Sequence, residues 1–267
     1  MSVRPCGPNN PTGGVKLTRS GAGSTRATIA LNKAAADAGA DVAIVITPGY
    51  FQFALPKAGV KQFFIDVAAA SPIPVMMYNF PGASGGIDID SELVVEIARE
   101  APNICGIKLT CGAVGKLTRI CADTATDKFA QYKRQSASAP TFVTLGGFAD
   151  FLLPTVAASR AHGAIMGLGN IFPRALNHLM ELSLKLAENP DKQTLQKAQA
   201  LQDLASATDL AFVKAGISGT KWFLQKHHGY PSARMRRPLL DYDAKKGEEL
   251  ERDPDVVAFL EIEKSLS

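Results

Sequence analysis

The chain has 267 residues. A single α/β barrel commonly runs to about 250 residues, so one domain is the leading expectation. The composition is 46% hydrophobic and 20% charged, which is ordinary globular usage and excludes a disordered scaffold. The net charge is +4, from 29 Lys and Arg against 25 Asp and Glu, without a concentrated basic block. A nucleic-acid partner is therefore not expected.

Cysteine usage and apolar stretches indicate the environment of the protein. The four cysteines lack CxxC spacing, so we expect neither a disulfide framework nor a zinc site, and a reducing compartment. They are Cys6, Cys105, Cys111 and Cys121. No apolar run approaches the ~20 residues that span a bilayer, so no membrane segment is expected. The first 36 residues carry basic but no acidic side chains, as transit peptides do, although Gly and Pro interrupt any amphipathic helix there. We expect a cytoplasmic protein, with the mitochondrion as the alternative.

Two patterns alternate after an irregular leader, rich in Pro, Gly and Asn, at residues 1–13. Apolar residues at helical spacing, such as Val60, Phe64 and Val67, are followed by short apolar runs typical of buried strands. The expected helices are 26–38, 57–70, 91–100, 114–124 and 149–159, and the expected strands are 42–46, 74–79, 104–110, 142–145 and 163–168, with a weaker candidate at 14–18. Strands that alternate with helices of 10–15 residues indicate βαβ units and a parallel sheet.

Beyond Pro173 the sequence predicts helices alone. Each expected helix has one apolar face: Leu176, Leu179, Met180 and Leu184; then Leu195, Ala198, Leu201 and Ala205; then Leu210, Val213 and Ile217; and a last helix near 256–264. We therefore expect an α/β fold of (β/α)8 TIM-barrel type, with a partial barrel at 1–172 and a C-terminal helical extension at 173–267 that form one structural unit. Five clear strands and one weak candidate are fewer than eight, so the barrel is expected to be incomplete at the N-terminus.

Two polar side chains stand at expected strand ends, where parallel α/β folds gather their reacting groups. Lys108 lies in an otherwise apolar strand. Desolvation would lower the pKa of such a lysine and leave an amine that can attack a carbonyl carbon and form a Schiff base. The alternative is an ion pair with an acid on a neighbouring strand, for which Asp150 is a candidate. Tyr78 is either a hydrogen-bonded core tyrosine or a phenol that relays protons beside the Schiff base.

Other motifs give weaker signals. The loop at 21–25 (GAGST) precedes a helix and could hold an anion on its N–H groups, but it matches neither a Walker loop nor a dinucleotide fingerprint. The histidines lie without a nucleophile elbow, so a Ser-His-Asp arrangement is not indicated. Because HExxH and acidic metal clusters are absent, we expect no metal and no cofactor.

The string at 78–82 (YNFPG), followed one βα unit later by 106–108 (GIK), closely resembles the dihydrodipicolinate synthase / N-acetylneuraminate lyase family of Schiff-base aldolases. The resemblance covers about residues 20 to 242. Further matching segments are 23–26 (GSTR), 38–41 (AGAD) before 47–50 (TPGY), 163–165 (GAI) before Asn170, and 237–240 (RPLL).

This resemblance implies a (β/α)8 barrel with a helical extension, usually tetrameric, in which Lys108 forms the Schiff base with a 2-keto acid. Tyr78 would donate and accept protons, and Ile165 would contact the keto acid through its main chain. Tyr50 matches a tyrosine that family members lend across a subunit interface, although Gly49 stands where the first aromatic of the usual pair is found.

The sequence also departs from the family pattern. Synthases carry an arginine after the tyrosine motif that holds the second substrate, whereas this chain has PGAS at 81–84. Leu109 follows Lys108 in place of the acidic residue common in synthases, and 108–112 (KLTCG) is similar to the branch of 4-hydroxy-2-oxoglutarate and 3-deoxy-hexulosonate aldolases. Nothing matches the Gly-Thr-Thr-Gly-Glu loop of the family's second strand, so the N-terminal βα units are expected to be missing.

The sequence thus predicts a lyase that cleaves a 4-hydroxy-2-keto acid to pyruvate and an aldehyde through a Lys108 imine. A silent, truncated member that acts as an assembly partner is one alternative, and a synthase-like condensing enzyme is another. The expected partners are a small 2-keto acid and further copies of the chain, as a dimer or tetramer, with neither nucleic acid nor membrane.

Overall fold

The computed structural model describes residues 15–135 and 141–266. The chain divides into two units, residues 1–145 and 146–267. The leader expected at 1–13, with Cys6, and the first residue of the candidate strand at 14–18 lie outside the described residues.

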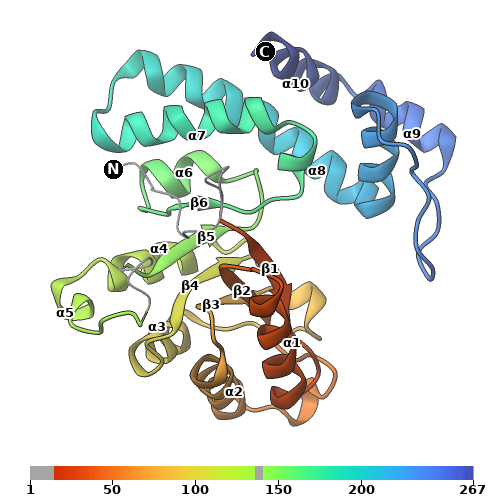
Figure 1. Ribbon diagram of the computed structural model, residues 1–267. Helices are drawn as coiled ribbons and strands as arrows, with labels where there is room; N and C mark the ends of the chain where they lie inside the picture. The colour runs from red at the N-terminus through yellow and green to blue at the C-terminus, as the bar shows by residue number, and fades with distance from the viewer. Residues whose placement is uncertain (1–14, 136–140, 267) are drawn as a thin grey trace. The chain divides into compact units, whose positions relative to one another are not determined.

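Strands and helices alternate throughout the first unit (Figure 1). Its strands are β1 (Leu17–Ser20), β2 (Val42–Ile46), β3 (Val75–Asn79), β4 (Ile104–Leu109) and β5 (Val143–Gly146), the last residue of which belongs to the second unit. Its helices are α1 (Thr25–Asp37), α2 (Lys57–Ala70), α3 (Ser91–Glu100), α4 (Val114–Thr124) and α5 (Asp127–Ala130), with 3-10 turns η1 (Gln52–Ala54) and η2 (Pro81–Ala83). The alternation expected from the sequence is confirmed, and α5 is an addition to it.

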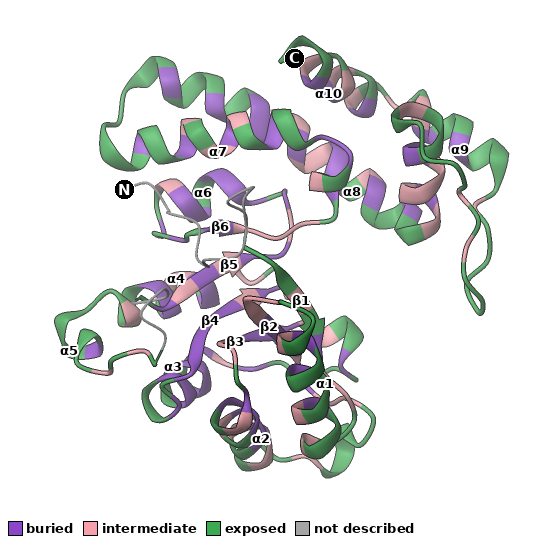
Figure 2. Cartoon of the chain, in the orientation of Figure 1, coloured by how far each residue is buried: buried purple, intermediate pink, exposed green. Residues whose placement is uncertain are grey.

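The strands of this unit pair in parallel and in chain order, β1 with β2, β2 with β3 and β3 with β4. Strands covered on both faces are continuous apolar runs, as β2 and β3 are, whereas the first strand β1 (LTRS) is partly exposed. All five residues of β3 are buried. The helices α1 to α4 each contact the next along the chain, and Figure 2 shows the buried strands β3 and β4 beside helices whose outer faces are exposed. In α2 the apolar face expected at Val60, Phe64 and Val67 is buried.

The second unit is mainly helical. It contains α6 (Leu152–Ala157), β6 (Gly163–Ala164), η3 (Leu168–Asn170), α7 (Pro173–Glu188), α8 (Lys192–His228), α9 (Ala244–Glu251) and α10 (Pro254–Ser265). Its core is an aromatic cluster in which Phe172 contacts Phe212, Phe223 and Phe259 with ring centroids 5.0–5.9 Å apart. The expected strand at 163–168 is shorter than predicted, because β6 ends at Ala164 and a 3-10 turn follows.

Helix α8 corrects one expectation. Leu210, Val213 and Ile217 do not form the buried face of a separate helix; they belong to α8 and are 53%, 54% and 65% exposed. The buried stripe of α8 continues from Ala198 at helical spacing through residues such as Ala205 and Phe212, which turns the three aliphatic residues outward. The backbone leaves helical geometry only at Gly216 (φ 65°, ψ −164°).

Six strands, β1 to β6, take chain order in the described part of the sequence, and only helical elements follow β6. This confirms the α/β class with a helical C-terminal part. A closed (β/α)8 barrel has eight strands. The incomplete N-terminus and the boundary between 172 and 173 stay predictions.

Candidate active site

Lys108 and Tyr78 lie side by side on neighbouring strands. The register of β3 and β4 pairs the two residues directly. Lys108 Nζ is 3.3 Å from Tyr78 Oη, within hydrogen-bond distance, and 4.4 Å from the centroid of the tyrosine ring. Both residues are at the carboxyl ends of their strands, one position before each strand ends. The structure thus brings together the two side chains that the sequence singled out.

The surroundings of this pair are apolar and closely packed. Tyr78 is 7% exposed and Lys108 is half-buried, among strand neighbours that are buried. Phe80 packs beside the Tyr78 ring with centroids 5.8 Å apart. At Gly106, two residues before the lysine, a Cβ atom would lie 2.2 Å from the Val143 carbonyl oxygen, so β4 admits only glycine there. An amine and a phenol in such a setting can attack a ketone and move a proton beside it.

A second set of polar side chains is centred on Asn79, the residue that directly follows Tyr78. The Asn79 amide donates to Asp88 Oδ1 (2.8 Å), and its own Oδ1 accepts the N–H of Ile89 (3.0 Å). The same Asp88 oxygen accepts a hydrogen bond from the ammonium of Lys116 in α4. Burial raises the pKa of Asp88, but the hydrogen bonds from Lys116 and Asn79 outweigh it and leave that pKa below its usual value.

The sequence analysis assigned no individual role to Asn79, Asp88 or Lys116. Lys116 occupies an inward position of an amphipathic helix, with the buried Leu117 and Ile120. A lysine on the apolar face of a helix is the signal that would have drawn attention to it, since lysine is rarely buried without a partner.

Two threonine hydroxyls are also buried at strand ends. Thr47 follows β2 and Thr110 follows β4, and they are 2% and 8% exposed. Among the described residues neither hydroxyl has a hydrogen-bond partner. A buried hydroxyl without a partner is costly in the free protein and is available to a bound oxygen.

Tyr50 lies in the segment after β2, well outside the core. It is 81% exposed, and Phe51 and Phe53 beside it are 58% and 79% exposed. The three rings touch edge to face in sequence. An exposed cluster of this kind is typical of a surface that meets another protein molecule.

Ile165 and Asp150 belong to the second unit. The Ile165 N–H donates to the Gly146 carbonyl (2.9 Å), and its side chain is half-buried. Burial raises the pKa of Asp150. The expected main-chain role of Ile165 and the alternative Lys108–Asp150 ion pair both stay predictions.

The loop at 21–25 uses part of its hydrogen-bonding capacity within the protein. The Ala22 N–H donates to Thr28 Oγ1 (3.0 Å), and Ser24 caps α1 by accepting the N–H of Ala27 (3.3 Å). These two groups are not free to hold an anion.

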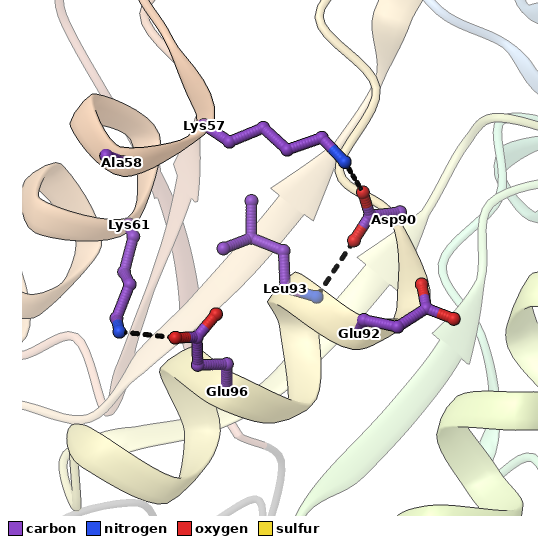
Figure 3. Close-up of a pocket in the computed structure, with 7 residues that line it drawn as sticks. All are labelled: Lys57, Ala58, Lys61, Asp90, Glu92, Leu93 and Glu96. Atoms are coloured by element: carbon purple, nitrogen blue, oxygen red, sulfur yellow. Dashed lines mark hydrogen bonds and ion pairs between the residues drawn. The ribbon is translucent and has the colours of Figure 1, made fainter.

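A surface pocket lies between α2 and α3, but its chemistry does not indicate a reaction centre (Figure 3). Four of its five charged side chains pair with one another, Lys57 with Asp90 and Lys61 with Glu96. The lining residues are Lys57, Ala58, Lys61, Asp90, Glu92, Leu93 and Glu96. Within residues 15–135 and 141–266, no three His, Cys, Asp or Glu side chains gather as a metal site would require.

Comparison with known proteins agrees with this geometry. Residues 12–255 match the dihydrodipicolinate synthetase family. The chain belongs to this family, as its sequence motifs suggested.

Individual relatives indicate which branch of this family the chain resembles most. The chain is 37% identical to an L-threo-3-deoxy-hexylosonate aldolase of Hypocrea jecorina over 91% of its own length and 72% of the relative's. It is 39% identical to a protein of Emericella nidulans named as a mitochondrial 4-hydroxy-2-oxoglutarate aldolase, over 84% of its own length and 65% of the relative's. A crystal structure of a dihydrodipicolinate synthase family protein from Coccidioides immitis superposes with a TM-score of 0.75 at 32% identity, covering 97% of this chain and 76% of that one. The expected resemblance to the aldolase branch is confirmed.

Proposed function

We propose that this protein is a class I aldolase that cleaves a 4-hydroxy-2-keto acid, either 4-hydroxy-2-oxoglutarate or a 2-keto-3-deoxy sugar acid, to pyruvate and an aldehyde. The observation that carries the proposal is the 3.3 Å contact between Lys108 Nζ and Tyr78 Oη at adjacent strand ends. The aldolase names of two relatives that align with most of this chain support it.

The reaction follows from the two groups. The Lys108 amine adds to the C2 carbonyl, and the Tyr78 hydroxyl gives its proton to the departing water, which leaves a protonated imine beside the tyrosine oxyanion. The Tyr78 oxygen, as base, takes the proton of the C4 hydroxyl while the C3–C4 bond breaks. The aldehyde leaves, and the electron pair passes into the imine to form an enamine. Protonation of the enamine at C3 and hydrolysis of the imine by water release pyruvate and restore the amine. With 4-hydroxy-2-oxoglutarate the aldehyde is glyoxylate.

Further residues support binding in this proposal. The Thr47 and Thr110 hydroxyls, buried without partners in the described chain, can bond to substrate oxygens. Ile165 would contact the keto acid through its main chain. The exposure of Tyr50, Phe51 and Phe53 suits a homo-oligomer, dimer or tetramer, in which Tyr50 reaches the proton relay of a second copy.

Trapping of the imine tests the mechanism. Borohydride with pyruvate should add mass to the Lys108 peptide and to no other peptide, because this amine stands beside a phenol at a strand end. Lys108→Met should abolish trapping, whereas Lys57→Met, which removes an exposed lysine, should not. Tyr78→Phe should slow turnover while trapping persists. Folded protein whose Lys108 peptide stays unmodified would overturn the proposal and favour a silent assembly partner.

The substrate is then found with a panel of 2-keto-3-deoxy sugar acids and 4-hydroxy-2-oxoglutarate, measured by pyruvate release. A condensing synthase is the less favoured alternative, since residues 81–84 lack the arginine expected for its second substrate. No helix of the described chain has the length and hydropathy of a membrane span. For location, cell fractionation distinguishes the cytoplasm from the mitochondrion, and the name of the Emericella nidulans relative supports the latter.

A further inference from the structure

We infer that Asn79, Asp88 and Lys116 form a positioning network that holds the Tyr78 phenol at its working distance from the Lys108 amine. This inference rests on the proposed function. The hydrogen bonds of these three side chains go to groups other than Tyr78 and Lys108, so each residue acts through the backbone that carries the pair.

The contacts of the network form a closed loop that starts next to Tyr78 and returns two residues beyond Lys108. Asn79 directly follows Tyr78, and its carbonyl oxygen accepts the N–H of Thr110, two residues beyond Lys108 (2.8 Å). Its side chain binds Asp88, and Asp88 binds Lys116 in α4, the helix that follows the lysine strand. These contacts therefore fix the end of β3 and the end of β4 relative to one another at two separate points.

Burial distinguishes this ion pair from the charged pairs on the surface. The difference lies in the lysine: the Lys116 side chain is 7% exposed, although its partner Asp88 is 49% exposed, whereas Lys57, which pairs with Asp90, is 77% exposed. A buried ammonium without its partner is strongly unfavourable, so Lys116 holds Asp88 in one place. An exposed pair contributes little and constrains little. Arg119, one turn further along α4, donates a hydrogen bond to Ser91 Oγ (2.9 Å). This bond connects α4 to the first residue of α3.

Both connections that follow the two strands contain glycine. The β3–α3 connection contains Gly82, Gly85 and Gly86, and the β4–α4 connection contains Gly112. Glycine can adopt more backbone conformations than other residues, so side-chain anchors help to fix the position of each strand end. Proton transfer depends steeply on geometry, and a displacement of about 1 Å can cost two orders of magnitude in rate.

Deuterium exchange into the methyl group of pyruvate measures this positioning without knowledge of the aldehyde. In D2O the Lys108 imine loses a C3 proton to the Tyr78 oxygen, forms the enamine, and takes back a deuteron, which NMR detects. The rate is divided by the number of sites that borohydride traps with pyruvate, so that misfolded protein is not counted. The variants are Lys116→Met and the near-isosteric Asp88→Asn, each made alone and together with Tyr78→Phe, and Lys57→Met is the matched control.

We expect Lys116→Met and Asp88→Asn to trap pyruvate fully but to exchange it about ten- to a hundredfold more slowly per trapped site. In the Tyr78→Phe background they should add less than twofold, because the phenol they position is gone. Lys57→Met should stay within twofold of the parent chain. If Lys116→Met does not fold, Asp88→Asn, which keeps the size of the side chain, decides the question.

An unchanged exchange rate in the folded variants would overturn the network, and so would an equal slowing with and without the Tyr78 hydroxyl. Both results leave the aldolase proposal intact. Parent protein that pyruvate and borohydride fail to modify at Lys108 would instead overturn the proposed function, and this inference with it.

Discussion

Gly49 and Gly85 approach so closely that neither position has room for a side chain. A Cβ atom on Gly85 would lie 2.5 Å from the Gly49 carbonyl oxygen, and one on Gly49 would lie 2.4 Å from the carbonyl carbon of Ser84. The backbone of the segment that carries Tyr50 therefore packs directly against the backbone of the loop after β3. This gives a physical reason for glycine where the family has an aromatic residue.

Replacing Gly49 by alanine should therefore destabilise the first unit. We expect Gly49→Ala to lower the free energy of unfolding by about 1–3 kcal/mol, because the clash is with backbone atoms that cannot rotate away. Urea denaturation measures the change. Gly23→Ala, where an added Cβ meets nothing within 4 Å, is the control and should change stability much less. Equal effects of the two substitutions would contradict the steric explanation.

Asp209 predicts a pH dependence of stability. Burial raises the pKa of this carboxyl to about 6, although it accepts the N–H of Ala149 (2.8 Å). The folded state then binds the proton more tightly than the unfolded state, whose pKa is about 4. The contribution of Asp209 to stability is full below pH 4 and is lost as the pH rises to about 6, by roughly 2–3 kcal/mol.

The Asp209→Asn variant should lose this slope between pH 4 and 6. Unfolding curves at several pH values, with the difference from the parent chain taken at each, isolate the contribution. Asp203→Asn, an exposed position on the same helix, should keep the parent slope. If the free energy of unfolding changed with pH equally in the parent chain and in Asp209→Asn, Asp209 would not be the source of the pH dependence.

Glu263 should stabilise the start of α7. Its carboxylate is 4% exposed and accepts the N–H groups of Arg174 (3.2 Å) and Ala175 (2.8 Å), which have no partner within their own helix. Glu263→Gln should cost about 1–2 kcal/mol, since the charge and one acceptor are lost next to two N–H donors. Thermal unfolding measures the effect against Glu261→Gln, which changes an exposed neighbour on α10. A Tm unchanged by Glu263→Gln would exclude this role.

Cys105 and Cys111 should differ in reactivity. Burial raises the pKa of the Cys105 thiol to about 12, so the reactive thiolate is scarce at neutral pH. Cys111 is half-buried, in the connection after β4. Iodoacetamide at pH 8 should label the Cys111 peptide in folded protein, and the Cys105 peptide only after denaturation. Peptide mass spectrometry reads both sites, and early labelling of Cys105 in the native protein would contradict its burial.

The candidate pair was predictable because its signals are local. Lys108 is a charged residue in an apolar strand, and Tyr78 ends the strand before it, so parallel pairing of consecutive strands puts them side by side. The network behind them was not predictable, since Asn79, Asp88 and Lys116 come from three different elements. Their meeting depends on how α4 packs on the loop after β3.

The sequence by itself determined the order of strands and helices, the bounds of elements such as α2 and α3, and the strand ends where polar residues stand. It could do so because periodicity and local backbone preference act over a few residues. Only the tertiary structure decided that Leu210, Val213 and Ile217 face outward, that Lys116 is buried against Asp88, and that Gly49 touches Gly85. These features depend on which segments, far apart in the sequence, pack against one another. Residue type alone does not determine whether a side chain is buried.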